Sequence, residues 1–452
     1  MSLRMGTLTR PQIEKLPKGQ LHEHLDCSLN PLIMLRLWWA KGFDNVNPPL
    51  PTQVVSDWQA AQDLRGRSVS ISQQAAAERM ERRAAAAYQE WLVGFASKSL
   101  KNYLDAIGNH VLPIMQTRQA LYDITCERIK RMSMCEVGGL PTKKRRKGWL
   151  QLRFAPQLHV GGELTTLDQV MEPIVQAVKE AAIPVELIIC SLRHEDQPFV
   201  AHNPIEELSD LAIKYPEVAA FDLAGGEAVF PGVLPWWLPA AKRVQAAGKR
   251  VTIHLWETNE PTDADLAALK ELFGEPEADD KIMLSSAMRH VVRLCTKISA
   301  TANPAEQQVY FDNITSWLDS VEETISRCGR IGHGIRGERQ GSFILEVCPT
   351  SNVVTSQVAS FAEHPVSKLF RQGKLVTINS DGTLFTKINL ADEYFRLQEA
   401  PHRFGLGEFY VCNYIALAAT SFSPEVKASL KAELTAGYRP GGGARGRRRS
   451  TK

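Results

Sequence analysis

The sequence predicts an α/β fold, a (β/α)₈ barrel of the TIM type with an N-terminal helical cap and a helical insertion after the fifth strand. Eight short apolar, β-branched runs are nearly all separated by helical segments, the pattern of parallel strands joined by crossover helices. Polar residues directly follow the first, fifth, sixth and eighth runs. In a barrel these strand ends ring one mouth, whereas in an open doubly wound sheet, the structural alternative, they would be strung out along an edge.

The N-terminal part is predicted to form the first strand and a helical cap. Residues 19–25 read as the first strand and 31–40 as an apolar helix. The prolines of 48–51 break it, and 72–100 has helical composition with alanines at its centre. Helices continue to about 134, so the cap covers about 31–148.

The remaining chain alternates strands with helices. Strands are expected at 149–154, 184–190, 218–223, 250–254, 330–333, 343–348 and 375–379. Helices are expected at 167–182, 203–214, 234–247 and 365–372, and further helices fill the chain to about 434. The segment between the fifth and sixth strands is much longer than one crossover needs, which predicts a helical insertion at about 258–320. We therefore expect one barrel domain over 1–438 and a disordered basic tail over 439–452.

The composition is that of an ordinary globular protein. The chain has 452 residues, of which 44% are hydrophobic and 23% are charged. It has no signal-peptide core near its start and no apolar run of about 18 residues, which argues against secretion and membrane spanning. Its eight cysteines include no Cys-x-x-Cys pair and predict reduced thiols in the cytoplasm.

Basic residues are unevenly distributed. The net charge is only +3, yet 143–147 is a run of Lys and Arg, and the tail from 439 carries several Arg. Such runs can bind nucleic acid, but a solvated loop and a disordered end explain them better. We expect a small-molecule partner, with neither nucleic acid nor membrane, and a homodimer is the candidate assembly.

Two histidines end the first predicted strand. His22 and His24 stand two residues apart, and because strand side chains alternate, both imidazoles lie on one face. Imidazole is the commonest metal ligand among side chains, so this strand end can supply two ligands. A His-x-His pair alone is a weak signal. It gains weight from His254 at the end of the fifth strand and Asp381 after the eighth.

These four residues form the predicted metal site. Three nitrogen donors and one carboxylate suit Zn²⁺, with a coordination position left for water. Bound Zn²⁺ lowers the pKa of water to about 7 and so supplies hydroxide at neutral pH. Each residue alone has an ordinary structural explanation, whereas their joint occurrence at strand ends predicts one zinc ion per chain.

Glu257 and His333 are the predicted acid–base residues, with Asp381 as a catalytic ligand. Glu257 follows His254 by three residues, on the loop that leaves the strand. A carboxyl there fits a general acid that protonates a ring nitrogen while hydroxide attacks the adjacent carbon. His333, flanked by two glycines, could deprotonate or orient the water.

Motifs spread from residue 16 to about 385 resemble those of the adenosine deaminase family, within the metal-dependent amidohydrolase barrels. They are Leu21-His22-Glu23-His24-Leu25-Asp26, Arg153-Phe154-Ala155-Pro156, Phe221-Asp222-Leu223-Ala224-Gly225-Gly226-Glu227, His254-Leu255-Trp256-Glu257, Gly332-His333-Gly334, Cys348-Pro349-Thr350-Ser351-Asn352 and Asn379-Ser380-Asp381. The resemblance implies the same metal ligands, with Glu257 donating a proton to purine N1 and His333 acting on the water. It also implies that the Gly225 backbone faces purine N3. Asp26 would hold the ribose 5′-hydroxyl, which favours a nucleoside over a free base.

Three positions depart from the family pattern. Trp256 replaces the Gly of His-Ala-Gly-Glu, and Cys27 replaces the Gly that follows Leu-Asp. Gly382 replaces a second Asp that holds purine N7. A ring nitrogen left buried and unpaired costs on the order of 1–3 kcal/mol. Trp256 and Gly382 are therefore expected at the substrate, where they would alter its recognition.

Three functions remain in competition. The first is a zinc-dependent hydrolase that deaminates adenosine or a related purine nucleoside, with the activated water attacking C6 and ammonia leaving. The second uses the same mechanism on a different 6-substituted purine or amino-heterocycle, which Trp256 and Gly382 favour. The third is a catalytically silent barrel with a binding role, and the complete set of ligands and acid–base residues argues against it.

Overall fold

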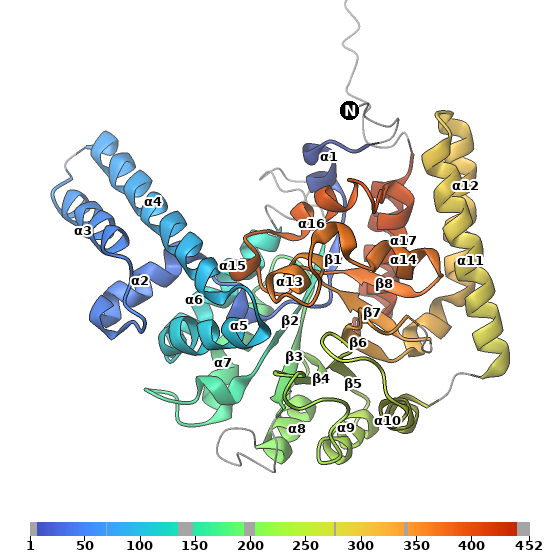
Figure 1. Cartoon of the computed structure of the whole chain (residues 1–452), viewed down its shortest axis with the longest axis horizontal. Helices are drawn as coiled ribbons and strands as arrows, with labels where there is room; N and C mark the ends of the chain where they lie inside the picture. Colours follow the sequence, from blue (N-terminus) through green and yellow to red (C-terminus); the bar gives the residue numbers. More distant parts are fainter. Residues whose placement is uncertain are drawn as a thin grey trace, which may run out of the picture.

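Eight parallel strands follow one another in chain order, β1 to β8, around a single sheet (Figure 1). The computed structural model describes residues 7–68, 70–133, 148–193, 204–274, 277–338 and 342–440. The strands are β1 (Gly19–Gln20), β2 (Trp149–Phe154), β3 (Val185–Leu192), β4 (Val218–Ala224), β5 (Arg250–Leu255), β6 (Arg330–His333), β7 (Ile344–Val347) and β8 (Leu375–Ile378). The predicted (β/α)₈ barrel is confirmed.

The first strand is shorter than predicted, and the barrel closes through the residues that follow it. The His24 amide donates to the Asp381 carbonyl at 2.9 Å, and the Asp381 amide donates to the His22 carbonyl at 3.1 Å. The side-chain oxygen of Asn379 accepts from the amides of Leu21 and His22. Because a side chain replaces the neighbouring strand as the acceptor here, strand pairing stops after Gln20. The same contacts bring the first and last strand ends together.

Helices surround the sheet and close both its ends. α1 (Arg10–Lys15) precedes β1, and the crossover helices include α7 (Leu167–Lys179), α8 (Ile205–Lys214), α9 (Leu238–Ala246), α10 (Asp263–Phe273) and α14 (Val366–Arg371). The short α13 (Pro349–Val354) and α15 (Thr383–Thr386) follow β7 and β8. The chain continues through α16 (Leu390–Leu397), α17 (Leu406–Ala418) and α18 (Pro424–Tyr438). Every residue of β2 and β4 is buried, as parallel strands covered on both faces require.

The cap consists of helices between β1 and β2, and part of it forms an arm that projects from the barrel (Figure 1). Its helices are α2 (Pro31–Lys41), α3 (Thr52–Gly66), α4 (Ile71–Ala96), α5 (Leu100–Ala106) and α6 (Arg118–Arg131). The sequence analysis missed α3, which starts directly after the proline run. Its buried residues Val54, Trp58 and Ala61 recur at helical spacing, and the buried Glu81 of α4 binds Arg65 of α3.

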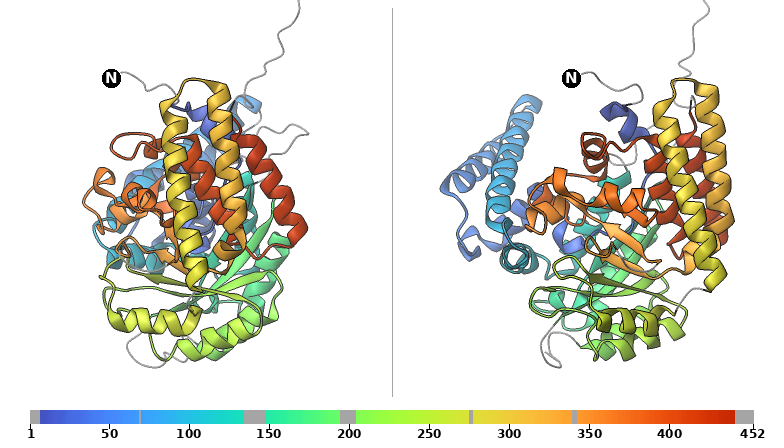
Figure 2. Two further views of the ribbon diagram at one scale, coloured as in Figure 1. Left: turned by 90° about the vertical axis from the view of Figure 1, so that its right-hand side faces the viewer. Right: turned by 45° about the vertical axis from the view of Figure 1, so that its right-hand side comes forward.

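The predicted insertion contains a long helical hairpin. α11 (Ala278–Ala300) and α12 (Pro304–Arg327) run antiparallel and stand beside α17 (Figure 2). Both helices bury an apolar stripe and expose charged residues. The hairpin extends to Arg327, seven residues beyond the expected end.

Several expectations concern residues that the structure leaves undescribed. The basic run 143–147 and tail residues 441–452 lie outside the described ranges, and the division of the chain into one domain and a tail stays a prediction. Among the described helices, none combines the length and apolar character needed to cross a membrane. The seven described cysteines are all free thiols.

Candidate active site

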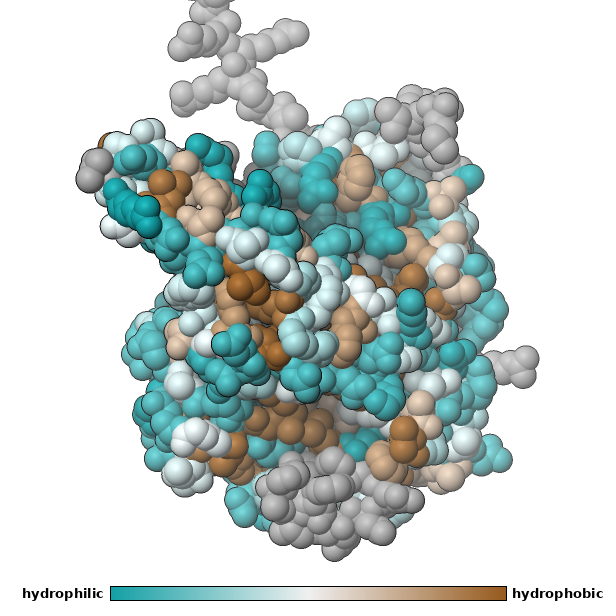
Figure 3. Space-filling model, turned by 60° about the vertical axis from the view of Figure 1, so that its left-hand side comes forward, coloured by the Kyte–Doolittle hydropathy of each residue, from teal (hydrophilic) through white to brown (hydrophobic). Residues whose placement is uncertain are grey.

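A cavity of about 340 Å³ lies at the carboxyl ends of the strands, a volume typical of small-molecule sites. Its floor carries the polar residues His24, His254, Glu257, His333 and Asp381. The cap supplies an apolar wall, which includes Leu100, Leu104, Ile107 and Leu112. In Figure 3, hydrophobic residues gather in the middle of the face below the projecting arm.

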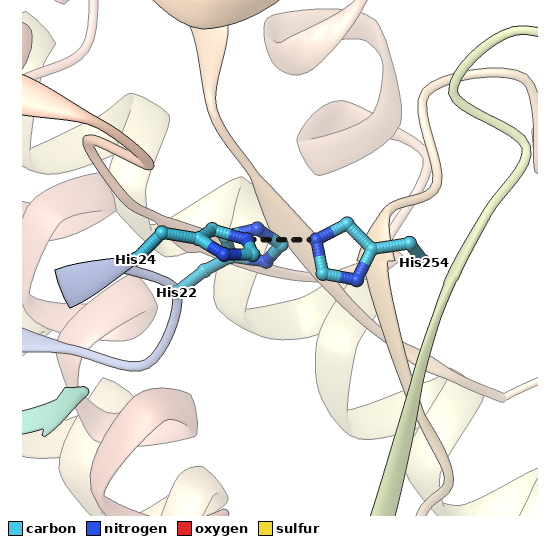
Figure 4. Close-up of side chains that lie close together, drawn as sticks. All are labelled: His22, His24 and His254. Carbon is cyan, nitrogen blue, oxygen red and sulfur yellow. Dashed lines mark hydrogen bonds between the residues drawn. The ribbon is translucent and has the colours of Figure 1, made fainter. Parts of the chain in front are cut away.

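The three histidines among the predicted metal ligands, His22, His24 and His254, lie together (Figure 4). His24 Nε2 and His254 Nε2 are 3.0 Å apart. Asp381 Oδ1 lies 3.6 Å from His24 Nε2 and 3.7 Å from His22 Nε2. Ligand atoms bonded at about 2.1 Å to a tetrahedral ion lie about 3.4 Å apart, so these separations fit Zn²⁺.

A second observation supports the fit to a cation. His22 Nε2 is buried and has no hydrogen-bond partner in the described part of the chain. A buried polar atom without a partner is unfavourable unless something binds it. The donor set therefore matches a metal in both geometry and chemistry.

Buried carboxylates fix the orientation of two of the histidines. His22 Nδ1 lies 3.0 Å from Glu346, and His254 Nδ1 lies 3.0 Å from Asp222. Because a carboxylate only accepts, each Nδ1 donates and leaves its Nε2 lone pair free for a metal. Arg153 bridges the two carboxylates, at 2.5 Å from Glu346 and 2.9 Å from Asp222. Burial alone would raise the pKa of Asp222, but the charges of His254 and Arg153 hold it well below its usual range.

Glu257 faces the metal site from the end of β5. Burial, followed by the charges of Asp381 and Glu227, raises the pKa of Glu257 to about 8. Its Oε1 accepts from Asn352 at 3.1 Å and from Thr355 at 3.4 Å. A carboxyl group with this pKa is protonated at neutral pH, which is the state that a general acid requires.

Glu227 holds the loop that carries Glu257. Its carboxylate accepts from three consecutive backbone amides, those of Trp256, Glu257 and Thr258, at 2.7, 3.0 and 2.8 Å. Consecutive amides that point at one anion form a concave binding site for that anion. The position of the acid is therefore determined by the loop, and the loop is fixed by Glu227.

His333 and Glu257 are linked through Asn352. The amide nitrogen of Asn352 lies 3.1 Å from both Glu257 Oε1 and His333 Nδ1, and its oxygen lies 3.1 Å from His364. Burial lowers the pKa of His333 to about 3, so its ring is neutral. Because the amide nitrogen of Asn352 can only donate, His333 Nδ1 accepts and Nε2 carries the ring hydrogen, 3.7 Å from Glu257 Oε2.

Backbone strain concentrates at the site. Trp256, His333 and Asp381 have φ values of 59°, 60° and 61°, in the left-handed region that disfavours residues other than glycine. Each such residue costs on the order of 1–3 kcal/mol, and such strain tends to cluster at functional sites. Trp256 directly follows β5, His333 ends β6, and Asp381 lies three residues after the end of β8.

The four predicted substrate-contacting residues divide into two pairs. Asp26 and Gly225 line the cavity. Trp256 and Gly382 are not among its described lining residues, so the expected direct contacts are not seen. The Trp256 indole is fully buried and packs against Phe343 and Gly337, because its left-handed backbone turns the side chain away. Gly382 is covered by Cys27 and Tyr103.

Sequence reasoning missed several residues that shape the site. Asp222, Glu346 and Arg153 are charged residues inside buried strands, and that position was a readable signal because lone charges are rarely buried. Asn352 was quoted in a motif without a role. Tyr103 lies in the cap, where no pattern marked it as part of the cavity.

Comparison with known proteins gives one family. The model of the adenosine deaminase family matches residues 69–272 and 315–436, well over half of the chain. The adenosine deaminase of Mycobacterium ulcerans is 27% identical over 412 residues, and that of Mycobacterium sp. strain KMS is 28% identical over 412 residues. Each alignment covers 88% of this chain and 88% of the relative.

Solved structures share the fold. Adenine deaminase from Arthrobacter aurescens aligns with a TM-score of 0.58 at 19% identity and covers 93% of this chain and 98% of its own. The N6-methyl-AMP deaminase from Arabidopsis thaliana aligns at 0.56 and 17%, covering 94% and 98%. A zinc-bound amidohydrolase from Burkholderia ambifaria aligns at 0.53 and 16%, covering 95% and 92%.

Proposed function

Because the chain belongs to the adenosine deaminase family, we propose that it hydrolyses the 6-amino group of adenosine or a related purine nucleoside and releases ammonia. The chain is a hydrolase that acts on carbon–nitrogen bonds of cyclic amidines, as its motifs predicted. One observation carries the proposal. The acid Glu257 and the neutral His333 line one cavity with His24, His254 and Asp381. His22 converges with His24 and His254, and its Nε2 lies 3.7 Å from Asp381.

The catalytic residues have separate tasks in this proposal. Glu257 donates its proton to N1 of the ring, which makes C6 more electrophilic. His333 orients the attacking water through its ring N–H and stabilises the negative charge that develops on the water oxygen. The water's proton passes to Glu257 once that carboxyl group has protonated N1, and it leaves with the amine as ammonia. Asn352 holds the two side chains at fixed positions, so that both face the same reacting carbon.

His22, His24, His254 and Asp381 would hold the zinc ion, one per chain. When bound, zinc supplies a water whose pKa is lowered to about 7. The convergent donors and the unpartnered His22 Nε2 support this assignment.

The charge of the cavity favours a nucleoside over a nucleotide. Among the described lining residues Arg193 is the one permanent cation, and its guanidinium already donates to the backbone carbonyls of Phe230, Gly232 and His254. Asp26 would repel a phosphate and can accept from a ribose hydroxyl. Burial raises the pKa of Asp26 to about 6, so the carboxylate form prevails at neutral pH.

The second candidate is a purine with another 6-substituent. The apolar cap wall near Leu104 and Ile107 would tolerate an alkyl group on the amine better than a charged one. The N6-methyl-AMP deaminase with the same fold shows that this architecture can process such an amine in another protein. The silent-barrel alternative is set aside because the chain is an enzyme of this family. The cytoplasm and a homodimer stay predictions.

The test is ammonia release by purified protein of known zinc content. The panel contains adenosine, 2′-deoxyadenosine, adenine, AMP, N6-methyladenosine and 6-chloropurine riboside, with methylamine release measured for N6-methyladenosine and chloride release for 6-chloropurine riboside. Fast turnover of adenosine, abolished in Glu257→Gln at unchanged zinc content, would support the first candidate. Preference for N6-methyladenosine would support the second. Absence of turnover of every purine by the zinc-loaded protein would refute both.

A further inference from the structure

Cys27, Tyr103 and Gly382 form one packed group beside the cavity. Gly382 has φ −125° and ψ 101°, an extended conformation that any residue can adopt. A Cβ on Gly382, however, would overlap the Tyr103 hydroxyl and lie 2.6 Å from the Cβ of Cys27. Glycine is therefore required at position 382 by packing and not by backbone conformation.

The departures from the family pattern at positions 27 and 382 are therefore linked: a side chain at one position excludes a side chain at the other. The pattern places glycine at the position of Cys27 and a carboxyl side chain at the position of Gly382. Here the side chain is at 27 and the glycine at 382, and the Tyr103 hydroxyl fills the space beside Gly382. Tyr103 belongs to α5. The polar group at this place therefore comes from the cap, whereas in the family pattern it comes from a loop of the barrel.

The Tyr103 hydroxyl lacks a strong partner within the protein. Tyr103 lines the cavity and is 4% exposed, and among the described residues its hydroxyl meets only the Cys27 thiol, a weak hydrogen-bonding group, without a well-formed hydrogen bond. Buried tyrosine hydroxyls usually find a partner. Its ring packs on Phe385 at 4.6 Å between centroids, which holds the hydroxyl in place. Burial raises the pKa of Tyr103 well above 10, so the group stays a donor.

The shape of a purine shows which atom this donor meets. N1 and N7 lie on opposite sides of C6. With C6 at the metal ligands and N1 at Glu257, which follows β5, N7 points to the opposite side of the barrel mouth. That side holds the ends of β8 and β1, where Gly382 and Cys27 lie beside Tyr103.

We propose that the Tyr103 hydroxyl donates a hydrogen bond to N7 of the bound purine, in place of a carboxyl group at position 382. The inference rests on the proposed function, since it presumes a purine with C6 at the metal site. It makes Tyr103 a specificity-determining residue contributed by the cap, and it replaces an ionisable reader of N7 with a neutral one.

The test compares adenosine with 7-deazaadenosine, which has a C–H group in place of N7. For the wild type, Tyr103→Phe and Tyr88→Phe, one measures kcat/KM for both substrates and the dissociation constants of inosine and 7-deazainosine. Tyr88→Phe is the matched control because Tyr88 is also a buried cap tyrosine with an unpartnered hydroxyl, but it is not among the described lining residues. Zinc content and melting temperature verify that each variant folds.

We expect Tyr103→Phe to reduce the preference for adenosine over 7-deazaadenosine about tenfold, by weakening adenosine alone. The preference for inosine over 7-deazainosine should fall similarly, and Tyr88→Phe should retain both. Unchanged preferences in a folded Tyr103→Phe variant that still turns over adenosine would overturn the role of Tyr103 alone. A zinc-loaded wild type that turns over none of the purines in the panel and does not bind inosine would overturn the proposed function and this inference together.

Discussion

His22 Nδ1 lies 3.0 Å from Oε2 of Glu346, a fully buried carboxylate that also binds Arg153 and Arg330. One side chain thus orients a predicted metal ligand and pairs with two cations inside the barrel. We therefore expect metal affinity and barrel stability to be coupled through Glu346.

We expect Glu346→Gln to weaken zinc binding by about 10- to 100-fold, because His22 loses the acceptor that fixes its tautomer. The variant should also be less stable by several kcal/mol, since buried Arg330 loses its counter-charge and Arg153 keeps only Asp222. Competition with a chromogenic chelator measures the affinity. Glu323→Gln, on the exposed face of α12, is the control and should change neither quantity. Wild-type zinc affinity in Glu346→Gln would contradict the coupling.

The ionisation of Glu257 is expected to determine how kcat/KM decreases at alkaline pH. Catalysis requires its protonated form, so kcat/KM falls as pH rises through its pKa. That pKa is raised to about 8 by burial and neighbouring carboxylates, and bound zinc lowers it because a cation stabilises the carboxylate. The alkaline limb of the kcat/KM profile, which reports the enzyme without substrate, is therefore expected to have its midpoint at or below pH 8. A limb above pH 9 in the zinc-loaded enzyme would contradict the assignment.

Thr355→Val should shift this limb to higher pH. Thr355 donates to Glu257 Oε1 at 3.4 Å and so stabilises the ionised form. Without that donor the carboxyl group holds its proton more tightly. The pH dependence of kcat/KM measures the shift, and a limb displaced to lower pH would exclude this role for the hydroxyl.

Glu227→Gln should shift the same limb in the opposite direction. The charge of Glu227 raises the pKa of Glu257, so its removal makes Glu257 easier to ionise. The glutamine side chain also binds the backbone N–H groups of residues 256–258 less strongly than the carboxylate does. The loop that carries Glu257 is then less well fixed, and we expect kcat to fall by at least tenfold. The opposite signs of the Thr355→Val and Glu227→Gln shifts distinguish an effect on Glu257 from a general disturbance. Two shifts of the same sign would point to another titrating group.

Gly382→Ala should destabilise the protein by about 1–3 kcal/mol, because the new methyl group overlaps the Tyr103 hydroxyl and Cys27. Tyr103→Phe in the same chain should recover part of the loss. Gly66→Ala is the control, since a Cβ there meets nothing within 4 Å. Chemical denaturation measures all three. A Gly382→Ala variant as stable as wild type would show that Cys27 and Tyr103 can move to accommodate the methyl group without cost.

Local patterns accounted for most of the barrel and for the histidines that lie together in it. β2 and β6 were predicted with their observed bounds, since apolar β-branched runs between helices have few other solutions. The weakest element was β1, where side-chain contacts from Asn379 replace strand pairing. α3 was missed because the preceding proline run was interpreted as a longer interruption than it is.

The sequence by itself determined the fold, the family and which polar residues lie together at the predicted site, because each follows a strand end whose position is set by chain order. Only the tertiary structure decided which way the remaining side chains point. The left-handed backbone of Trp256 turns its side chain out of the cavity. Tyr103 lines the cavity and lies beside Gly382, although the two residues are 279 positions apart in the chain. The orientation of one and the long-range packing of the other depend on contacts that no local pattern encodes.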